Sequence, residues 1–187
     1  LNCQLTWTES ANRWSISGNQ AVYSTEFSGW ARADTDLASS DHYAEVAPTG
    51  FDGTAATRHS GCICRKDATT TETYYHGRVQ QIGGAGNDLW RSAKTVSGTQ
   101  TLIGTDTTLE WTGGGETIRI EANGSTITRY RNGVSQNSVT DTAITGNLRT
   151  GIYAFGGAHT LDNFEAADLA AAASLVLRKR INVLLRR

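Results

Sequence analysis

The sequence predicts an all-β domain in which two antiparallel sheets pack face to face. The 187 residues include 20 glycines, five tryptophans and a single proline, a composition that suits many short strands joined by tight turns. Apolar and polar residues alternate over short runs bounded by Gly, Asn, Asp or Ser, and no helical period occurs before residue 165. A chain of this length buries about 70% of its unfolded surface in one core. One domain is therefore expected.

The alternating runs predict eight strands in the first part of the chain. They cover residues 14–17, 21–24, 30–33, 42–47, 60–66, 73–80, 88–94 and 101–103.

Two Asn-Gly pairs, Asn123-Gly124 and Asn132-Gly133, predict two hairpins in the second part of the chain. Asn-Gly supplies the two positive-φ residues that a type I′ turn needs. Alternating residues flank both pairs, so a meander of three strands is expected over residues 117–121, 126–131 and from 134 onward. Two further strands are expected at 151–155 and 161–164.

Several short motifs in this region resemble a known family. They are Arg119-Ile120-Glu121, Tyr130-Arg131-Asn132-Gly133-Val134, Thr140-Asp141, Gly151-Ile152 and Leu161-Asp162-Asn163-Phe164. In this order they are similar to the C-terminal half of a laminin-G-like, concanavalin A-like jelly roll, above all to the versions found in bacteriophage virion proteins and bacterial surface proteins. The resemblance implies a two-sheet antiparallel jelly-roll sandwich over residues 1–168, with residues 169–187 as a tail outside it. Because such folds host lectins, glucanases, adhesins and structural modules, function has to be argued from a site.

The carboxylates argue against a glycosidase. A retaining enzyme needs two carboxyl groups about 5 to 5.5 Å apart, and concanavalin A-like glucanases carry Glu, Asp and Glu at alternating positions of one strand. Asp34-Thr35-Asp36 is the nearest run here, and it lacks a flanking glutamate. Catalytic Ser or Cys signatures, a P-loop and an HExxH motif are also absent from the sequence. The sequence predicts a protein that is not an enzyme.

Glycan binding would use an aromatic ring that stacks on a sugar, surrounded by groups that bond the hydroxyls. The candidate residues are Trp30, Arg32, Tyr74, Tyr75, His76, Arg78, Trp90, Arg129 and Arg131. The alternative is that these rings fill the core. Tyr74 and Tyr75 are neighbours on one strand, so they face opposite sides and one of them is expected outside.

Arg129 and Arg131 depart from the family pattern, which is usually apolar at positions that share the parity of Ile127. Either Thr126, Thr128 and Tyr130 take over the core face, or the arginines lie on a concave polar face and contact a ligand or partner. An unpaired buried pair is not expected.

No cofactor is predicted, except that the resemblance allows a structural calcium at Asp141 and Asp162, whose carboxylates supply the oxygen ligands that calcium prefers. Cys62 and Cys64 would point to the same face of one strand and, with Cys3, give an odd count. Small buried thiols are therefore expected instead of a disulfide framework.

The tail combines apolar and basic residues. Leu177, Ile181, Leu184 and Leu185 would form one stripe if the tail is helical, although an added edge strand is the alternative. The basic residues are Arg178, Lys179, Arg180, Arg186 and Arg187. All five follow the last acidic residue, and the whole chain carries a net charge of −1, so residues 1–168 carry −6. The tail is expected to dock on its own sandwich, on another subunit or on an anionic surface.

Two functions remain. The first is a non-enzymatic component of a phage virion surface, as capsid decoration or tail protein, that docks to virion or self subunits through the tail and has glycans as a further ligand. The second is a free or cell-surface carbohydrate-binding module of a larger bacterial protein. Either places the chain on a virion surface or outside the cell. The sequence predicts no membrane span and no sequence-specific nucleic-acid binding.

Overall fold

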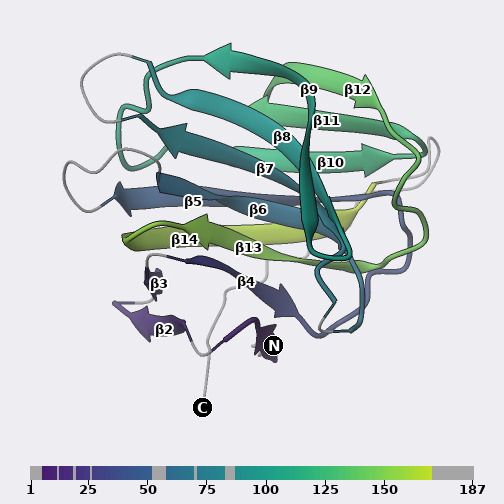
Figure 1. The fold of residues 1–187 in the computed structure, drawn as a ribbon, viewed down its shortest axis with the longest axis horizontal. Coiled ribbons are helices and arrows are strands. Elements are labelled where there is room, and N and C mark those ends of the chain that lie inside the picture. Colours follow the sequence, from purple (N-terminus) through teal and green to yellow (C-terminus); the bar gives the residue numbers. More distant parts are fainter. Residues whose placement is uncertain are drawn as a thin grey trace.

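The computed structural model describes residues 6–11, 13–18, 20–25, 27–51, 58–69, 71–82 and 87–169. It is an all-β sandwich of two antiparallel seven-stranded sheets, which Figure 1 shows as two stacked layers with sheet A in front. Sheet A has the strand order β1-β4-β13-β6-β7-β8-β9, and sheet B has the order β12-β11-β10-β5-β14-β3-β2. These residues contain no helix, and hence no helix able to cross a membrane. The predicted jelly-roll sandwich is confirmed.

The strands of sheet A are β1 (Trp7–Glu9), β4 (Ser28–Ala33), β13 (Arg149–Phe155), β6 (Arg58–Lys66), β7 (Tyr74–Gln81), β8 (Leu89–Val96) and β9 (Thr99–Thr108). Those of sheet B are β12 (Val134–Thr140), β11 (Thr126–Arg131), β10 (Ile118–Asn123), β5 (His42–Phe51), β14 (Ala158–Asp168), β3 (Gln20–Ser24) and β2 (Trp14–Ser17). Every strand expected from the alternating runs is present. The sequence pattern missed β1, and β5, β9 and β14 are longer than expected.

The two Asn-Gly pairs form different turns. Asn132 and Gly133 have φ values of 49° and 75° and connect β11 to β12, which confirms the predicted type I′ turn. At the first pair, Asn123 is paired with Thr126, so the loop is Gly124-Ser125. Only Gly124 of these two has a positive φ, as in a type II′ turn. The hairpin is present, but the predicted turn type and its register were wrong.

The main core lies between the sheets and includes Tyr23, Tyr75, Trp90, Ile120 and Leu161. Two of its polar ring atoms have partners: Trp90 Nε1 donates to the carbonyl of Leu109 at 2.9 Å, and the Tyr75 hydroxyl donates to Asp141 Oδ1 at 2.6 Å. These bonds remove the penalty for burying an indole N–H and a phenol.

Two thiols share this interior. Cys62 and Cys64 are free and buried, as predicted, and Cys3 lies outside the described residues. Burial raises the pKa of Cys64 to about 12, which keeps the thiol protonated and unreactive.

The arginines of β11 correct a prediction. Ile127, Arg129 and Arg131 face the interior, and Ile127 belongs to the core. Arg129 is fully buried; its Nη2 donates to Thr107 Oγ1 at 2.7 Å, while Nε and Nη1 have no partner among the described residues. The alternative in which Thr126, Thr128 and Tyr130 take over the core face is therefore wrong, and of the two arginines only Arg129 is buried without an ion pair among the described residues, since Arg131 pairs with Glu116. Burial lowers the pKa of Arg129 to about 10, against the opposing charge of Asp106.

The last strand ends at Asp168, and the described part of the chain ends at Leu169. The predicted docking residues, from Leu177 to Arg187, lie outside the described residues. Docking through them therefore stays a prediction.

Candidate functional site

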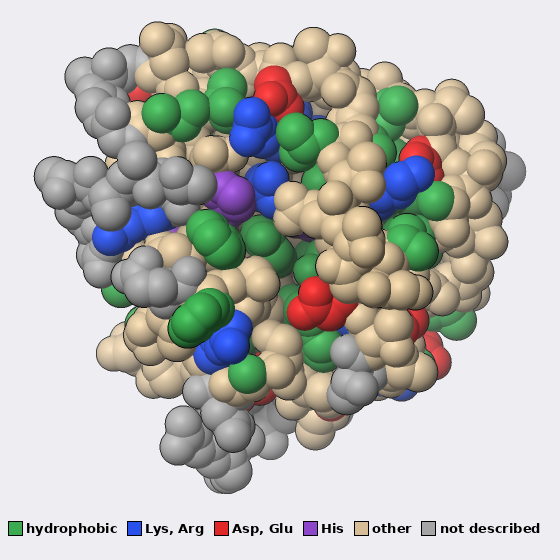
Figure 2. Space-filling view, in the orientation of Figure 1, with side chains coloured by type: hydrophobic (Ala, Val, Ile, Leu, Met, Phe, Trp, Pro, Cys, Tyr) green, Lys and Arg blue, Asp and Glu red, His purple; other side chains and the backbone are tan. Residues whose placement is uncertain are grey.

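A second apolar cluster covers the outer face of sheet A, the face turned away from the sandwich core. It consists of Trp30 on β4, Ile63 on β6, Tyr74 on β7 and Tyr153 on β13, with Phe155 packed against them. Directly paired residues of neighbouring strands share a face, and Tyr153 is paired with both Trp30 and Gly61. The consecutive strands β6 and β7, together with β4 and β13 from distant parts of the sequence, thus bring these rings together. Figure 2 shows a hollow near the middle of the molecule, bordered by apolar, basic, acidic and histidine side chains.

A pocket of ≈ 370 Å³ opens on this face. It is lined by Ser28, His59, Glu72, Tyr74, Thr95, Gly98, Gln100, Tyr153 and Phe155. Its size falls within the range of about 300 to 1,000 Å³ that is usual for small-ligand sites. Aromatic walls with a few polar groups between them are suited to a ligand that has both an apolar face and hydroxyl groups.

The aromatic residues of the pocket hold each other in place. The Tyr153 ring lies 4.6 Å from His76 and 6.5 Å from Tyr74, measured between centroids, and His59 lies 5.1 Å from Phe155. Such packing fixes the side-chain rotamers before any ligand arrives. A ligand that stacks here would therefore immobilise little that is not already ordered.

Gly61 leaves space at the centre of the face. It is paired with Tyr153 on one side and Arg78 on the other. A Cβ atom at this position would come within 2.0 Å of the Gly77 carbonyl oxygen, so a side chain cannot be accommodated without a shift of the backbone. The Arg78 and Tyr153 side chains therefore meet with no third side chain between them, and the guanidinium lies 6.0 Å from the Tyr153 ring centroid.

Two neutral histidines lie on the same face. Both ring nitrogens of His59 and of His76 lack a hydrogen-bond partner within the described ranges, and both residues are buried. Burial, followed by the charge of Arg78, lowers the pKa of His59 to about 2. The same two causes hold the pKa of His76 well below its usual value. His59 lines the pocket, where its neutral ring can offer a ligand one N–H donor and one nitrogen acceptor, whereas His76 is fully buried behind it.

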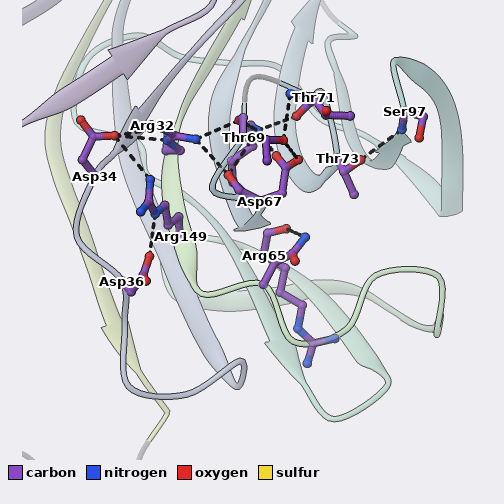
Figure 3. A network of polar contacts seen from close by, with 12 residues as sticks. Arg32, Asp34, Asp36, Arg65, Asp67, Thr69, Thr71, Thr73, Ser97 and Arg149 are labelled. Carbon is purple, nitrogen blue, oxygen red and sulfur yellow. Dashed lines mark hydrogen bonds and ion pairs between the residues drawn. The ribbon is translucent and has the colours of Figure 1, made fainter.

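The end of the face near β1 is closed by a polar network, shown in Figure 3. Arg32 donates to the Asp34 carboxylate and to the carbonyls of Asp67 and Thr69, at 2.9 to 3.3 Å. Arg149 donates to Asp36 at 2.6 Å. Asp34 and Asp36, the nearest sequence match to a glucanase run, are therefore held in ion pairs.

Lys66 is a fully buried residue of this polar network. Its ammonium group is fully buried, forms an ion pair with Asp67, donates to the Thr71 carbonyl at 2.7 Å and lies 4.5 Å from the Trp30 ring centroid. Burial lowers the pKa of Lys66, and the hydrogen bond to Asp67 opposes that shift. Because the ammonium covers the Trp30 ring, Trp30 is not free to stack on a sugar.

The predicted ligand-binding residues divide into two groups. Those on the outer face of sheet A are Trp30, Arg32, Tyr74, His76 and Arg78. Tyr75, Trp90 and Arg129 are buried between the sheets, which corrects their prediction as glycan contacts. Arg131 faces the same side; it forms an ion pair with Glu116, and its guanidinium lies 4.8 Å from the Trp90 ring centroid.

The sequence argument missed His59, Glu72, Gln100, Tyr153 and Phe155. Only Tyr153 and Phe155 had a usable signal, because both alternate along a predicted strand. Nothing in the sequence states that β13 lies beside β6.

The pocket has one carboxylate, that of Glu72, among the described residues that line it. The outward positions of β7 are Tyr74, His76, Arg78 and Gln80, with no acid among them. The pair of carboxylates that a retaining glycosidase uses is therefore not found in the described lining.

The two calcium candidates are occupied by protein donors. Asp141 accepts from Tyr75, from Lys94 at 2.6 Å and from the Ala143 amide at 2.9 Å. Asp162 accepts from the Asn163 amide at 2.7 Å. Within the described ranges, no three His, Cys, Asp or Glu residues are arranged to hold a metal ion. The structure gives no support for calcium at either position.

Comparison with known proteins finds no matching family model and no match among curated proteins. Solved structures do match. A carbohydrate-binding module, CBM66 from Bacillus subtilis, superposes with a TM-score of 0.71 at 16% identity, over 90% of this chain and 99% of the module. A β-glucanase of Bacillus licheniformis gives 0.59 at 12% identity over 91% and 94% of the two chains. A legume lectin-like domain from Entamoeba histolytica gives 0.59 at 8% identity over 88% and 90%. The chain thus has the concanavalin A-like jelly-roll fold that lectins, glucanases and carbohydrate-binding modules share.

Proposed function

We propose that this chain is a carbohydrate-binding module and that the outer face of sheet A is its glycan site. The observation that carries the proposal is the ≈ 370 Å³ pocket, in which the Tyr74, Tyr153 and Phe155 rings stand beside His59 and Glu72. The rings can stack on the apolar face of a pyranose or furanose. The imidazole and carboxylate groups can bond its hydroxyls.

The fold agrees with this proposal without deciding it. A carbohydrate-binding module and a lectin-like domain are among the superposed structures, and so is a β-glucanase. Binding without hydrolysis is favoured here because Glu72 is the single acid in the described lining.

The test is a glycan array probed with the wild-type chain and two tyrosine variants. Tyr153→Ala removes the central ring of the pocket and is expected to weaken binding of any retained glycan at least about tenfold. Tyr130→Ala is the matched control, since Tyr130 lies on the outer face of sheet B, where its hydroxyl bonds Glu121 at 3.4 Å. Equal loss in both variants, or no glycan retained by the wild type, would contradict the proposal.

The virion function predicted from the sequence stays a second proposal. It rests on the resemblance to phage proteins and on the basic, apolar tail, which lies outside the described residues. Truncation before Ser174 tests it: the sandwich should stay folded while assembly or attachment is lost. Unchanged assembly of the truncated chain would remove its main support.

A further inference from the structure

Arg78 lies at the centre of the proposed glycan face, and no described residue forms an ion pair with it. It is 2% exposed and sits in the middle of β7, paired with Gly61 on one side and Arg91 on the other. Its Nη1 donates to Gln100 Oε1 at 3.1 Å, and its Nε has no partner among the described residues. Its other hydrogen-bond partner among the described residues is the Tyr153 side chain, so both partners of this guanidinium are neutral groups.

Many of the other described arginines have acidic partners. Arginines with a carboxylate partner include Arg32, Arg65, Arg91, Arg119, Arg131 and Arg149. Arg129 likewise has no ion pair with a described residue, but it is enclosed between the sheets. Arg78 is therefore the buried arginine that, within the described ranges, lacks an ion pair and belongs to the ligand face.

Gln100 can give way to a ligand. It lies on β9, the edge strand of sheet A, and its side chain is exposed and lines the pocket. Rotation of this side chain would uncover the guanidinium at little cost, because an exposed glutamine regains its hydrogen bonds from water. The amide oxygen thus occupies the position that a ligand oxygen would take.

The surroundings of Arg78 favour an anion at this position. His76 is two residues before it on β7, and His59 is two residues before Gly61 on β6, so all three side chains lie on one face. The imidazole N–H of His59, which lines the pocket, can add a hydrogen bond to an oxyanion. A guanidinium binds a carboxylate or sulfate through charge-assisted hydrogen bonds, which are roughly twice as strong as neutral ones. Glu72 precedes β7 and faces the pocket from the other end of that strand, where it can accept from sugar hydroxyls.

We infer that Arg78 is an anion subsite and that the glycan bound by this face carries a carboxylate or sulfate group. The inference rests on the proposed function. It adds a ligand class: acidic glycans in place of neutral ones, oriented with the acidic group at Arg78 and hydroxyls towards Glu72.

The test uses pairs of oligosaccharides that differ only in charge. Galacturonate and glucuronate oligomers are compared with their methyl esters, and sulfated oligosaccharides with their desulfated forms, by calorimetry at low and at high salt. We expect at least about tenfold tighter binding of the acidic member in one set of pairs, with the difference reduced by salt. The set that responds distinguishes a carboxylate from a sulfate.

Two variants connect this preference to Arg78. Arg78→Gln should abolish it. Gln100→Glu has nearly the same shape, but it supplies an internal carboxylate to Arg78, so it should raise the midpoint of thermal unfolding and also abolish the preference. A variant that merely misfolds cannot do both.

The outcomes separate the two claims. Equal binding of charged and neutral members, or a preference that survives both variants, overturns the anion subsite and leaves the carbohydrate-binding proposal standing. Binding of neither member in every pair, together with an empty glycan array, overturns both.

Discussion

His59 makes the stability of the fold dependent on pH. Its ring is buried beside Phe155, and its pKa in the fold is about 2, against an ordinary value of 6.5. The unfolded chain therefore binds a proton between these two values and the folded chain does not. The stability that His59 contributes is fully present above pH 6.5 and is lost as the pH falls below it.

The magnitude follows from the shift. A solution at pH 5 lies 1.5 units below the pKa of 6.5 that His59 has in the unfolded chain. Each unit corresponds to about 1.36 kcal/mol. Keeping His59 neutral therefore costs about 2 kcal/mol at pH 5. His59→Gln removes the titration. It should lower the free energy of unfolding by about 1 kcal/mol at pH 7, through the lost ring contact, and should equal or exceed the wild type at pH 5.

Urea unfolding followed by tryptophan fluorescence at pH 7, 6 and 5 measures this difference. The loss of unfolding free energy between pH 7 and pH 5 should be about 2 kcal/mol smaller in His59→Gln than in the wild type. Ile63→Val, a change in a neighbouring apolar residue of the same face, is the control: it should shift the whole curve by about 1 kcal/mol without changing its slope. Parallel curves for wild type and His59→Gln would refute the reasoning, since they would mean that His59 titrates normally in the fold.

Three further predictions concern other residues. Arg65→Lys should destabilise the fold by about 3 kcal/mol in urea unfolding, because the buried guanidinium bonds the carbonyls of Ile144 and Gly124 at 3.0 and 2.7 Å and lysine cannot reach both; a loss below about 1 kcal/mol would show that these bonds contribute little. Arg129→Met should stabilise by about 1 to 2 kcal/mol, since it removes a buried charge whose Nη2 has Thr107 as its hydrogen-bond partner; a lower unfolding temperature would contradict this. Hydrolysis of β-glucan should be undetectable by reducing-sugar assay, and cleavage that disappears in Glu72→Gln would show that the pocket is catalytic.

The local pattern was enough to predict an all-β chain and most of its strands, while the jelly-roll arrangement was expected from the family resemblance. Alternation of apolar residues located the strands, and Asn132-Gly133 fixed one hairpin through its positive-φ turn. At Asn123-Gly124 the hairpin was predicted correctly but its register was not, because glycine alone satisfies a type II′ turn. The residues of a turn thus predict where the chain reverses more reliably than they predict which residue takes the first central position of the turn.

The site was predictable only in part. Tyr74, His76 and Arg78 share one strand, so one parity argument places all three on a common face. Tyr153 and His59 join them because β13, β6 and β7 are neighbours in sheet A. That order depends on crossovers between strands that are distant in sequence, and no local pattern encodes it.

At Arg129 two sequence arguments disagreed about whether the side chain is buried. Its position in the alternation of β11 indicated the interior, and the cost of burying a charge argued against it. Arg129 is buried because it shares the inward face of β11 with Ile127. The paired strands β10 and β12 fix which face of β11 points inward.

The central claim, that the outer face of sheet A binds glycan, is tested most directly by backbone amide chemical-shift mapping of the labelled chain. A glycan retained on the array is titrated into the protein. The largest shifts should fall on β6, β7 and β13, around His59, Tyr74 and Tyr153. Shifts that cluster on the outer face of sheet B, around Tyr43 and Tyr130, would contradict the claim.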